Sequence, residues 1–222
     1  MNEFLWILTL IFSFCGVLLF YKLFGKVGLF VWISIATIIC NIQTTKLIDI
    51  FGLETSLGTI LYGSTFLATD IINEKYGKEQ AKKTILMGFL VMIFMTSLMT
   101  IALLYIPSKS DFANESLKII FTLNIRITIA SICGFVISQL TDTVLYNMLK
   151  MKFKGLWIRN NISTIISQLL DTIIFVVITY LGSIPIKSIA IIACTMYVLK
   201  LFVAIFDTPF MYLSKKIKCN EI

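Results

Sequence analysis

Residues 4–24, FLWILTLIFSFCGVLLFYKLF, form an apolar run that carries one charged residue, Lys22. A helix of about 20 apolar residues crosses the roughly 30 Å hydrocarbon core of a bilayer. The run is longer than the apolar core of a signal peptide, follows no basic segment and lacks a small-residue cleavage site. We therefore interpret it as a retained transmembrane helix.

The composition extends this interpretation to the rest of the chain. Of the 222 residues, 58% are hydrophobic and 14% are charged, and the mean hydropathy is +0.94. An ordinary soluble domain has about 25% charged residues. No polar stretch is long enough to bury a core of its own. We expect residues 1–222 to form one integral membrane domain.

Seven apolar segments follow one another, without the alternation of apolar and polar residues found in the strands of a membrane barrel. Helices satisfy every backbone hydrogen bond within the bilayer, so the segments predict an all-α bundle of about seven transmembrane helices. The segments are residues 4–22, 28–50, 56–76, 84–106, 117–149, 158–182 and 187–213.

Lysine and arginine residues are concentrated in alternate loops. The rich segments are 22–26, 75–83, 150–159 and 215–218. The opposite side has only Lys46, Lys109, Lys118 and Lys187. The positive-inside rule therefore predicts an outside N-terminus and a cytoplasmic C-terminus. The net charge of +7 is explained by this topology, and we expect no nucleic-acid partner.

The residues used in common enzyme chemistry are missing or scattered. The chain has no histidine, and its five cysteines lack the spacing of metal ligands. It contains no Walker A sequence, no Gly-rich dinucleotide turn and no GxSxG motif. We expect no metal, no cofactor and no enzymatic activity.

Polar residues nevertheless occur inside the apolar segments. Residues 66–83, FLATDIINEKYGKEQAKK, lead an apolar helix into two acids, an amide and a basic run. Asn73 shares a helical face with Tyr62, and Asp70 lies at the edge of that face. Asn41 lies deep in the preceding segment. Small and hydroxyl residues often only pack transmembrane helices together, but packing alone does not explain an amide or a carboxylate at this depth.

Two predicted helices share a short sequence, SQLTDT at 138–143 and SQLLDT at 167–172. In each, a glutamine and an aspartate are three residues apart and so share a helical face. Consecutive helices are antiparallel, so we expect the two words to meet at the same depth from opposite directions. The four residues concerned are Gln139, Asp142, Gln168 and Asp171.

A charged side chain inside a bilayer costs several kcal/mol and normally faces a cavity or a partner. One interpretation is a structural set of ion pairs, in which Lys200 pairs with Asp171 or Asp207. Four acids against two bases leave such a set unbalanced, which favours a polar cavity. Arg126 lies about 160° around a straight helix from Asp142, so it faces a different neighbour unless the helix bends.

Carboxylates and amides in such a cavity suit a planar heterocycle that carries an amide. A guanine-type edge offers two adjacent N–H donors to a carboxylate and a carbonyl acceptor to an amide or a lysine. Tyr62, Phe66 and Tyr197 would supply a stacking face. Amino acids, cations and other vitamins would also fit, so the residues alone leave the substrate open.

Several of these stretches together resemble the queuosine precursor transporter family, which is grouped with vitamin uptake transporters. The resemblance covers about residues 30–215 and rests on FLATDIINEKYGKEQAKK, on Asn41 in CNIQTTK, on Arg126, on the QLTDT and LLDT helices and on KLFVAIFDTP at 200–209. The first helix lies outside the six-helix pattern of shorter members, so the topology of those members does not transfer directly to this chain.

The resemblance implies a multi-pass carrier in the bacterial inner membrane that imports the 7-deazaguanines preQ0, preQ1 or queuine for tRNA modification. The expected partners are this small molecule and the lipid bilayer, and faces of small residues permit a homodimer. The candidate substrate-binding residues are Asn41, Asp70, Asn73, Arg126, Gln139, Asp142, Gln168, Asp171 and Lys200.

Other functions stay open at this point. The first alternative is a substrate-binding subunit of an ATP-driven vitamin uptake system, although the first helices lack the Ala-x-x-x-Ala spacing expected for docking to an ATPase module. A membrane-embedded enzyme is disfavoured by the absence of histidine and metal-ligand spacing. A purely structural membrane protein would bind no small ligand.

Overall fold

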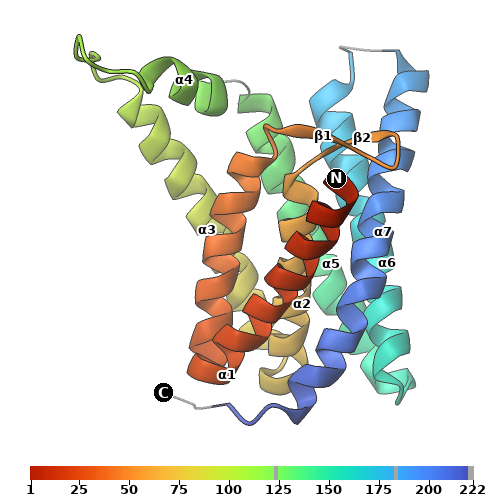
Figure 1. Cartoon of the computed structure of the whole chain (residues 1–222). Helices are drawn as coiled ribbons and strands as arrows, with labels where there is room; N and C mark the ends of the chain where they lie inside the picture. Colours follow the sequence, from red (N-terminus) through yellow and green to blue (C-terminus); the bar gives the residue numbers. More distant parts are fainter. Residues whose placement is uncertain (123–124, 183–184, 220–222) are drawn as a thin grey trace.

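The computed structural model describes residues 1–122, 125–182 and 185–219. Within these ranges, the side chains of residues 47, 53–56, 122, 125–128 and 188 are not described. Most of the helices run along one axis, and a two-stranded sheet lies across one end of the bundle (Figure 1). We call this end the hairpin end. The opposite end, which carries Lys75, Lys150 and Lys215, is the basic end.

Helix α1, Asn2–Gln43, consists of two arms joined at Gly25. Gly25 has φ 56° and ψ −133°, a conformation that only glycine adopts without strain. The chain descends from the N-terminus at the hairpin end and returns beside itself, as Figure 1 shows. The arms, residues 2–24 and 26–43, therefore correspond to the first two helices that the sequence predicts.

The second predicted helix, 28–50, ends earlier than expected. Strands β1, Leu47–Ile50, and β2, Leu53–Ser56, form an antiparallel hairpin in which Ile50 pairs with Leu53. Phe51 and Gly52 both have positive φ, 52° and 75°, as a two-residue type I′ turn requires. The prediction of helix through residue 50 is wrong because the Phe-Gly turn folds this segment back on itself.

Helix α2, Gly58–Tyr76, is the central helix of the bundle. From Gly58 to Asn73, every residue except Tyr62 is buried. It packs against α1 and against three helices introduced below, α3, α5 and α7. Since its neighbours shield it on all sides, α2 needs no apolar outer face and can carry polar residues such as Thr65, Thr69 and Asp70.

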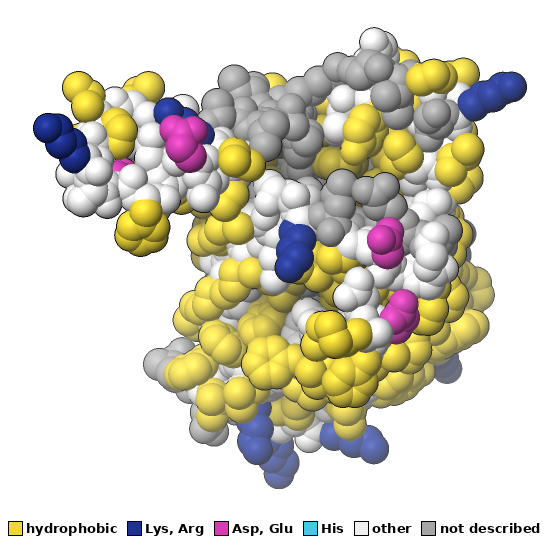
Figure 2. Space-filling model, turned by 45° about the horizontal axis from the view of Figure 1, so that its top comes forward, with side chains coloured by type: hydrophobic (Ala, Val, Ile, Leu, Met, Phe, Trp, Pro, Cys, Tyr) yellow, Lys and Arg dark blue, Asp and Glu magenta, His cyan; other side chains and the backbone are white. Residues whose placement is uncertain are grey.

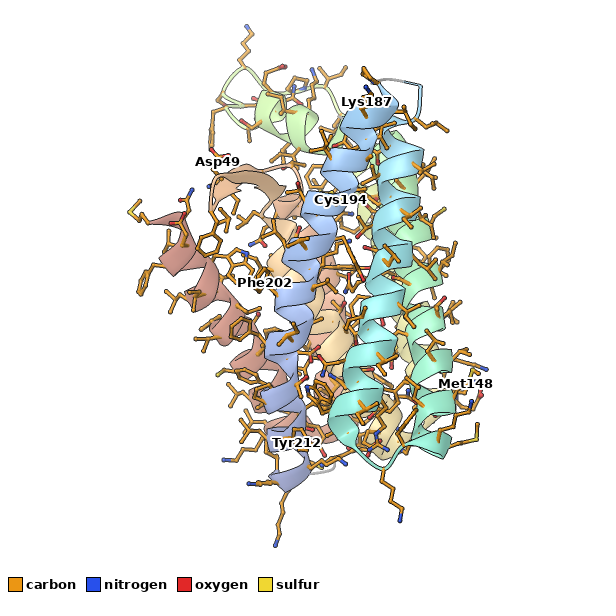
Figure 3. All side chains as sticks on the ribbon, turned by 90° about the vertical axis from the view of Figure 1, so that its right-hand side faces the viewer. Asp49, Met148, Lys187, Cys194, Phe202 and Tyr212 are labelled. Atoms are coloured by element: carbon orange, nitrogen blue, oxygen red, sulfur yellow. The ribbon has the colours of Figure 1, made fainter. Side chains whose placement is uncertain are left out.

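The remaining helices complete the bundle. They are α3 (Lys78–Ala102), α4 (Asn114–Thr122), α5 (Ile125–Lys152), α6 (Leu156–Tyr180) and α7 (Ile186–Lys216). Where the sequence predicts one helix over 117–149, the structure has α4 and α5, and residues 123 and 124 between them lie outside the described part. Figure 1 shows α4 lying across the hairpin end. Figure 3 shows α7 running beside α6 from Lys187 to Tyr212.

The outer surface of the bundle is apolar. Among the described residues, α1, α3, α5, α6 and α7 are each long and apolar enough to cross a membrane. Large side chains such as Phe12, Phe94 and Ile205 are more than half exposed. Figure 2 shows hydrophobic side chains over most of the body of this view. A surface of this kind belongs in lipid, so the chain is a multi-pass helical membrane protein.

Candidate functional site

A cavity lies between the helices in the half of the bundle nearer the hairpin end. Water molecules can enter about 80 Å³ of it. Because one water molecule needs about 10–15 Å³ by this measure, the cavity has room for several. Its wall combines polar and aromatic side chains from α1, α2, α5, α6 and α7. The wall includes Asn41, Tyr62, Phe135, Asp171, Phe175 and Lys200.

The polar part of the cavity is built around an ion pair between α6 and α7. Lys200 Nζ contacts Asp171 Oδ2, and the two side chains are only 6% and 7% exposed. The Tyr62 hydroxyl donates a hydrogen bond of 2.9 Å to Asp171 Oδ1. Lys200 Nζ also lies 5.6 Å from the centre of the Tyr62 ring. The structure therefore forms one of the two pairs that the sequence allowed for Lys200.

The aromatic part of the cavity comes from Tyr62 and Phe135, whose ring centres are 6.1 Å apart. Phe66 packs edge-on behind Tyr62, with 5.4 Å between the ring centres, and is buried. Tyr197 donates its hydroxyl hydrogen to the backbone oxygen of Ile165. Of the three rings expected to stack on a ligand, only Tyr62 belongs to the described lining of the cavity.

The two similar sequences, 138–143 on α5 and 167–172 on α6, lie against each other as predicted. Ser167 Oγ donates to Asp142 Oδ1 at 3.0 Å. The Tyr62 hydroxyl connects the two sequences as well, because it lies 3.2 Å from Ser138 Oγ and donates a hydrogen bond to Asp171. A Cβ on Gly134 would lie 2.7 Å from Asp171 Oδ1, so a glycine is needed for this close approach of α5 and α6.

A second polar layer lies further toward the basic end. The carboxyl groups of Asp70 and Asp142 are fully buried and interact with each other. They lie on facing stretches of α2 and α5, between the hydrogen bonds that join Thr65 to Gln139 and Asn73 to Asn147. Asp207 is also buried and accepts a hydrogen bond of 2.8 Å from Asn160 Nδ2. Neither Asp70 nor Asp142 belongs to the described lining of the cavity. The layer is sealed from the surface in this conformation.

The basic end is closed by contacts of one carboxylate, Glu74 on α2. Lys150 Nζ on α5 lies 2.9 Å from Glu74 Oε2, and Lys215 Nζ on α7 lies 3.0 Å from Oε1. Arg159 on α6 donates to Oε1, and the Tyr146 hydroxyl donates to Oε2 at 3.1 Å. We call Glu74 with Lys150, Arg159 and Lys215 the Glu74 latch. It ties four helices together.

The structure distributes the predicted site residues over these layers. Asn41, Asp171 and Lys200 line the cavity. Asp70, Asn73, Gln139, Asp142 and Gln168 are buried deeper, outside the described lining. Two of the amides have partners there: Gln139 Nε2 donates to Thr65 Oγ1, and Asn73 Oδ1 accepts from Asn147 Nδ2. The side chain of Arg126 lies outside the described residues, so its role stays a prediction.

The sequence analysis missed two residues of the polar layers. Arg159 was counted only as a loop charge, yet it is 6% exposed and contacts Glu74. Asn160 was not singled out, yet its amide binds Asp207. The signal available was the run Arg-Asn-Asn at 159–161, three consecutive polar residues at the start of an apolar segment.

Comparisons with known proteins place the chain in a family. Residues 56–214 match the family model described as "putative vitamin uptake transporter". The chain belongs to this family. A Bacillus subtilis (strain 168) member named "probable queuosine precursor transporter" is 40% identical over 223 residues, which cover 99% of this chain and 97% of that protein.

A second relative has the same name. This "probable queuosine precursor transporter" from Haemophilus influenzae (strain ATCC 51907 / DSM 11121 / KW20 / Rd) is 30% identical over 134 residues, or 60% of this chain and 55% of that protein. No solved structure matches the chain significantly. The matched region, 56–214, contains α2 to α6 and most of α7, and therefore the Asp171–Lys200 pair and all of the Glu74 latch except Lys215.

Proposed function

We propose that this protein is a bacterial inner-membrane carrier that imports queuosine precursors, 7-deazaguanines such as queuine, preQ1 or preQ0. The observation that carries the proposal is the 40% identity, over 99% of the chain, to a protein named as a transporter of such precursors. The cavity supports it independently, because its residues suit a planar base with several N–H groups. Both relatives are named as transporters, which fits a protein without enzymatic activity.

The base binds in the cavity with its edge toward the Asp171–Lys200 pair. Each carboxylate oxygen has two acceptor sites, so Asp171 still accepts N–H groups of the base while it binds Tyr62 and Lys200. Lys200 or the Asn41 amide donates to the ring carbonyl. The rings of Tyr62 and Phe135 cover the face of the base.

The hairpin end faces the outside and the basic end faces the cytoplasm. Lys22, Lys75, Lys150 and Lys215 belong to the basic segments, and the positive-inside rule assigns such segments to the cytoplasm. The cavity then lies in the outer half of the bundle, and the Glu74 latch closes its inner end.

Import follows from alternating exposure of the cavity to the two sides. In the conformation described, the latch holds α2, α5, α6 and α7 together at the cytoplasmic end. Release of the base requires these contacts to break and the helices to separate there. The deeper polar residues Asp70, Gln139, Asp142 and Gln168 line the path that opens.

Ligand-induced stabilisation of the purified protein tests binding. A ligand at 100 times its dissociation constant adds about 2.7 kcal/mol to the folded state. We expect queuine, preQ1 or preQ0 to raise the melting temperature in detergent, whereas biotin does not. Asn41→Ala, which removes an amide from the cavity without changing the charge, should reduce the shift.

The matched control is Asn114→Ala, which removes an amide from α4, away from the cavity. It should leave the stabilisation by the precursors unchanged. A well-folded wild-type protein that no 7-deazaguanine stabilises would contradict the proposed function. Equal loss of stabilisation in both variants would contradict the assignment of Asn41.

A further inference from the structure

The Asp70–Asp142 pair has an unusual shortage of hydrogen-bond donors. Both side chains are fully buried. Among the described residues, none donates a hydrogen bond to either oxygen of Asp70 or to Asp142 Oδ2. Ser167 donates a hydrogen bond to Asp142 Oδ1, and the hydroxyl groups of Ser163 and Thr164 also interact with the Asp142 carboxyl group. Carboxylates only accept hydrogen bonds, so two of them in contact cannot bond to each other without a proton.

The basic side chains nearest to the pair form ion pairs with other carboxylates. Lys200 pairs with Asp171, and Arg159 belongs to the Glu74 latch. Among the described side chains, no ion pair reaches Asp70 or Asp142. Within the described part of the bundle, the pair therefore lacks a countercharge.

The titratable groups that face the pair are acids and a phenol. Asp207 on α7 and Glu74 on α2 act on Asp70, and Tyr146 on α5 lies near it. The basic residue of α6 is Arg159, and it pairs with Glu74. The remaining charges of α1 and α3 lie at the ends of the two arms of α1 and in the first two turns of α3, and they are exposed or half-buried: Glu3, Lys22, Lys26, Lys78, Glu79, Lys82 and Lys83.

Two charged carboxylates in contact in a sealed site repel each other, and both lose their hydration. One proton between them removes one charge and supplies the missing hydrogen bond. Two buried carboxyl groups that interact directly usually share one proton in this way. The local geometry thus calls for a bound proton.

From this geometry we propose that Asp70 and Asp142 form a proton-binding site, and that one proton crosses the membrane with each molecule of substrate. The second half of the proposal rests on the proposed function. The proton comes from water outside, binds between the two carboxyl groups, and leaves to cytoplasmic water after the basic end opens. No other reactant is needed.

The position of the pair suits this role. Asp70 is eight residues from Tyr62, which lines the cavity, and four residues from Glu74 in the latch. At 1.5 Å per residue, the pair lies about 12 Å inward from the cavity wall and about 6 Å before the latch. A proton held there becomes accessible to the cytoplasm only when the latch opens.

Infrared spectroscopy of the purified protein tests the proton directly and needs no substrate. A protonated carboxyl group gives a C=O stretching band separate from the bands of carboxylates and amides. We expect wild type to show such a band at neutral pH and both Asp70→Asn and Asp142→Asn to lose part of it. Glu79→Gln, which removes an exposed carboxylate on α3, should retain it.

The asparagine side chain has the shape of a protonated aspartate and offers N–H donors, so both variants should fold. If either variant fails to fold, the presence of a protonated-carboxyl band in wild type, and its shift in heavy water, decide whether a proton is bound. Absence of a protonated-carboxyl band in wild type would overturn the proposal. A band of equal size in wild type and in both folded variants would also overturn it.

Transport by the protein in lipid vesicles tests the coupling. The probe is radiolabelled preQ0, which has no basic amine, at zero membrane potential. An inward proton gradient of one pH unit is a tenfold ratio of protons, so wild type should accumulate preQ0 about tenfold. Asp142→Asn should lose this accumulation while it still exchanges internal for external preQ0.

The outcomes separate the two proposals. If wild type exchanges preQ0 but ignores the proton gradient, proton coupling is refuted and the proposed function stands. If wild type transports none of preQ0, preQ1 and queuine, the proposed function fails, and the infrared result alone decides the proton site. If Asp142→Asn accumulates preQ0 as wild type does, the assignment of the pair is wrong.

Discussion

The Glu74 latch offers the sharpest mutational prediction. Glu74→Gln removes the carboxylate that joins four helices but keeps the size of the side chain. Removing one partner of a buried pair such as Glu74–Arg159, with side chains 11% and 7% exposed, costs about 3–5 kcal/mol. The side chains of Lys150 and Lys215 are 37% and 39% exposed, so each of their contacts with Glu74 adds about 0.2–1 kcal/mol.

The closed cytoplasmic end should therefore lose about 3.4–7 kcal/mol relative to an open one. A difference of about 5.5 kcal/mol converts a 1:99 mixture of two states into a 99:1 mixture. Glu74→Gln should thus make the inward-open form a major species.

The assay is labelling of a cysteine placed beneath the latch. Ser163 on α6 is fully buried, so Ser163→Cys in a version without the native cysteines reports the opening of this end. The reagent is a membrane-impermeant maleimide applied to the cytoplasmic face. We expect labelling to be slow with an intact latch and at least about tenfold faster with Glu74→Gln, since tenfold requires only about 1.4 kcal/mol.

The control is Glu79→Gln at the same end of the bundle. Its carboxylate pairs with Lys82 at 3.2 Å and is 77% exposed, so its loss should change little. Equal labelling rates in Glu74→Gln and Glu79→Gln, with equal thermal stability, would refute the latch.

Three further predictions concern the cavity and the fold. Asp171→Asn leaves the Lys200 charge buried without its partner and should lower the stability of the fold by about 3–5 kcal/mol. Combining Asp171→Asn with Lys200→Met should recover most of the lost stability in thermal unfolding. A double variant that is no more stable than Asp171→Asn alone would contradict the pairing. Gly134→Ala should weaken ligand-induced stabilisation, because the added Cβ would clash with Asp171. The control is Gly155→Ala, whose Cβ would lie 3.6 Å from its nearest neighbour and should leave the stabilisation unchanged. Equal effects of the two variants would argue against the close contact between Gly134 and Asp171. Gly25→Ala forces a side chain into a positive φ and should lower stability by about 1 kcal/mol, and an unchanged melting temperature would contradict the observed reversal between the arms of α1.

Much of the fold follows from hydrophobic segments alone. Runs of about 20 apolar residues have few options in lipid, so helical segments and their order are well determined. The hairpin at 47–56 was missed because Leu47, Ile48 and Ile50 are apolar enough to continue a helix. Its decisive feature is the Phe-Gly turn, whose effect depends on pairing between the strands.

The site was predictable where two sequence features constrained each other. The repeated words around Asp142 and Asp171 had to meet because consecutive helices are antiparallel, and they do. The depth of each acid was not predictable, since it depends on which helix is central. Asp70 lies on an enclosed helix, outside the described lining of the cavity in this conformation, so its expected contact with a ligand stays a prediction. The contact between Arg159 and Glu74 was missed because Arg159 belongs to the basic segment 150–159, which the sequence analysis assigned to a loop.

The central claim, import of queuosine precursors, is tested most directly in cells that cannot make these precursors. Expression of the wild-type chain, with queuine, preQ1 or preQ0 supplied at limiting concentration, is followed by measurement of queuosine in tRNA. The account predicts that the modification returns with the wild-type chain and falls back when Asn41 and Asp171 are replaced together. A wild-type chain that reaches the membrane yet gives no more queuosine than empty cells, with every precursor tried, would contradict it.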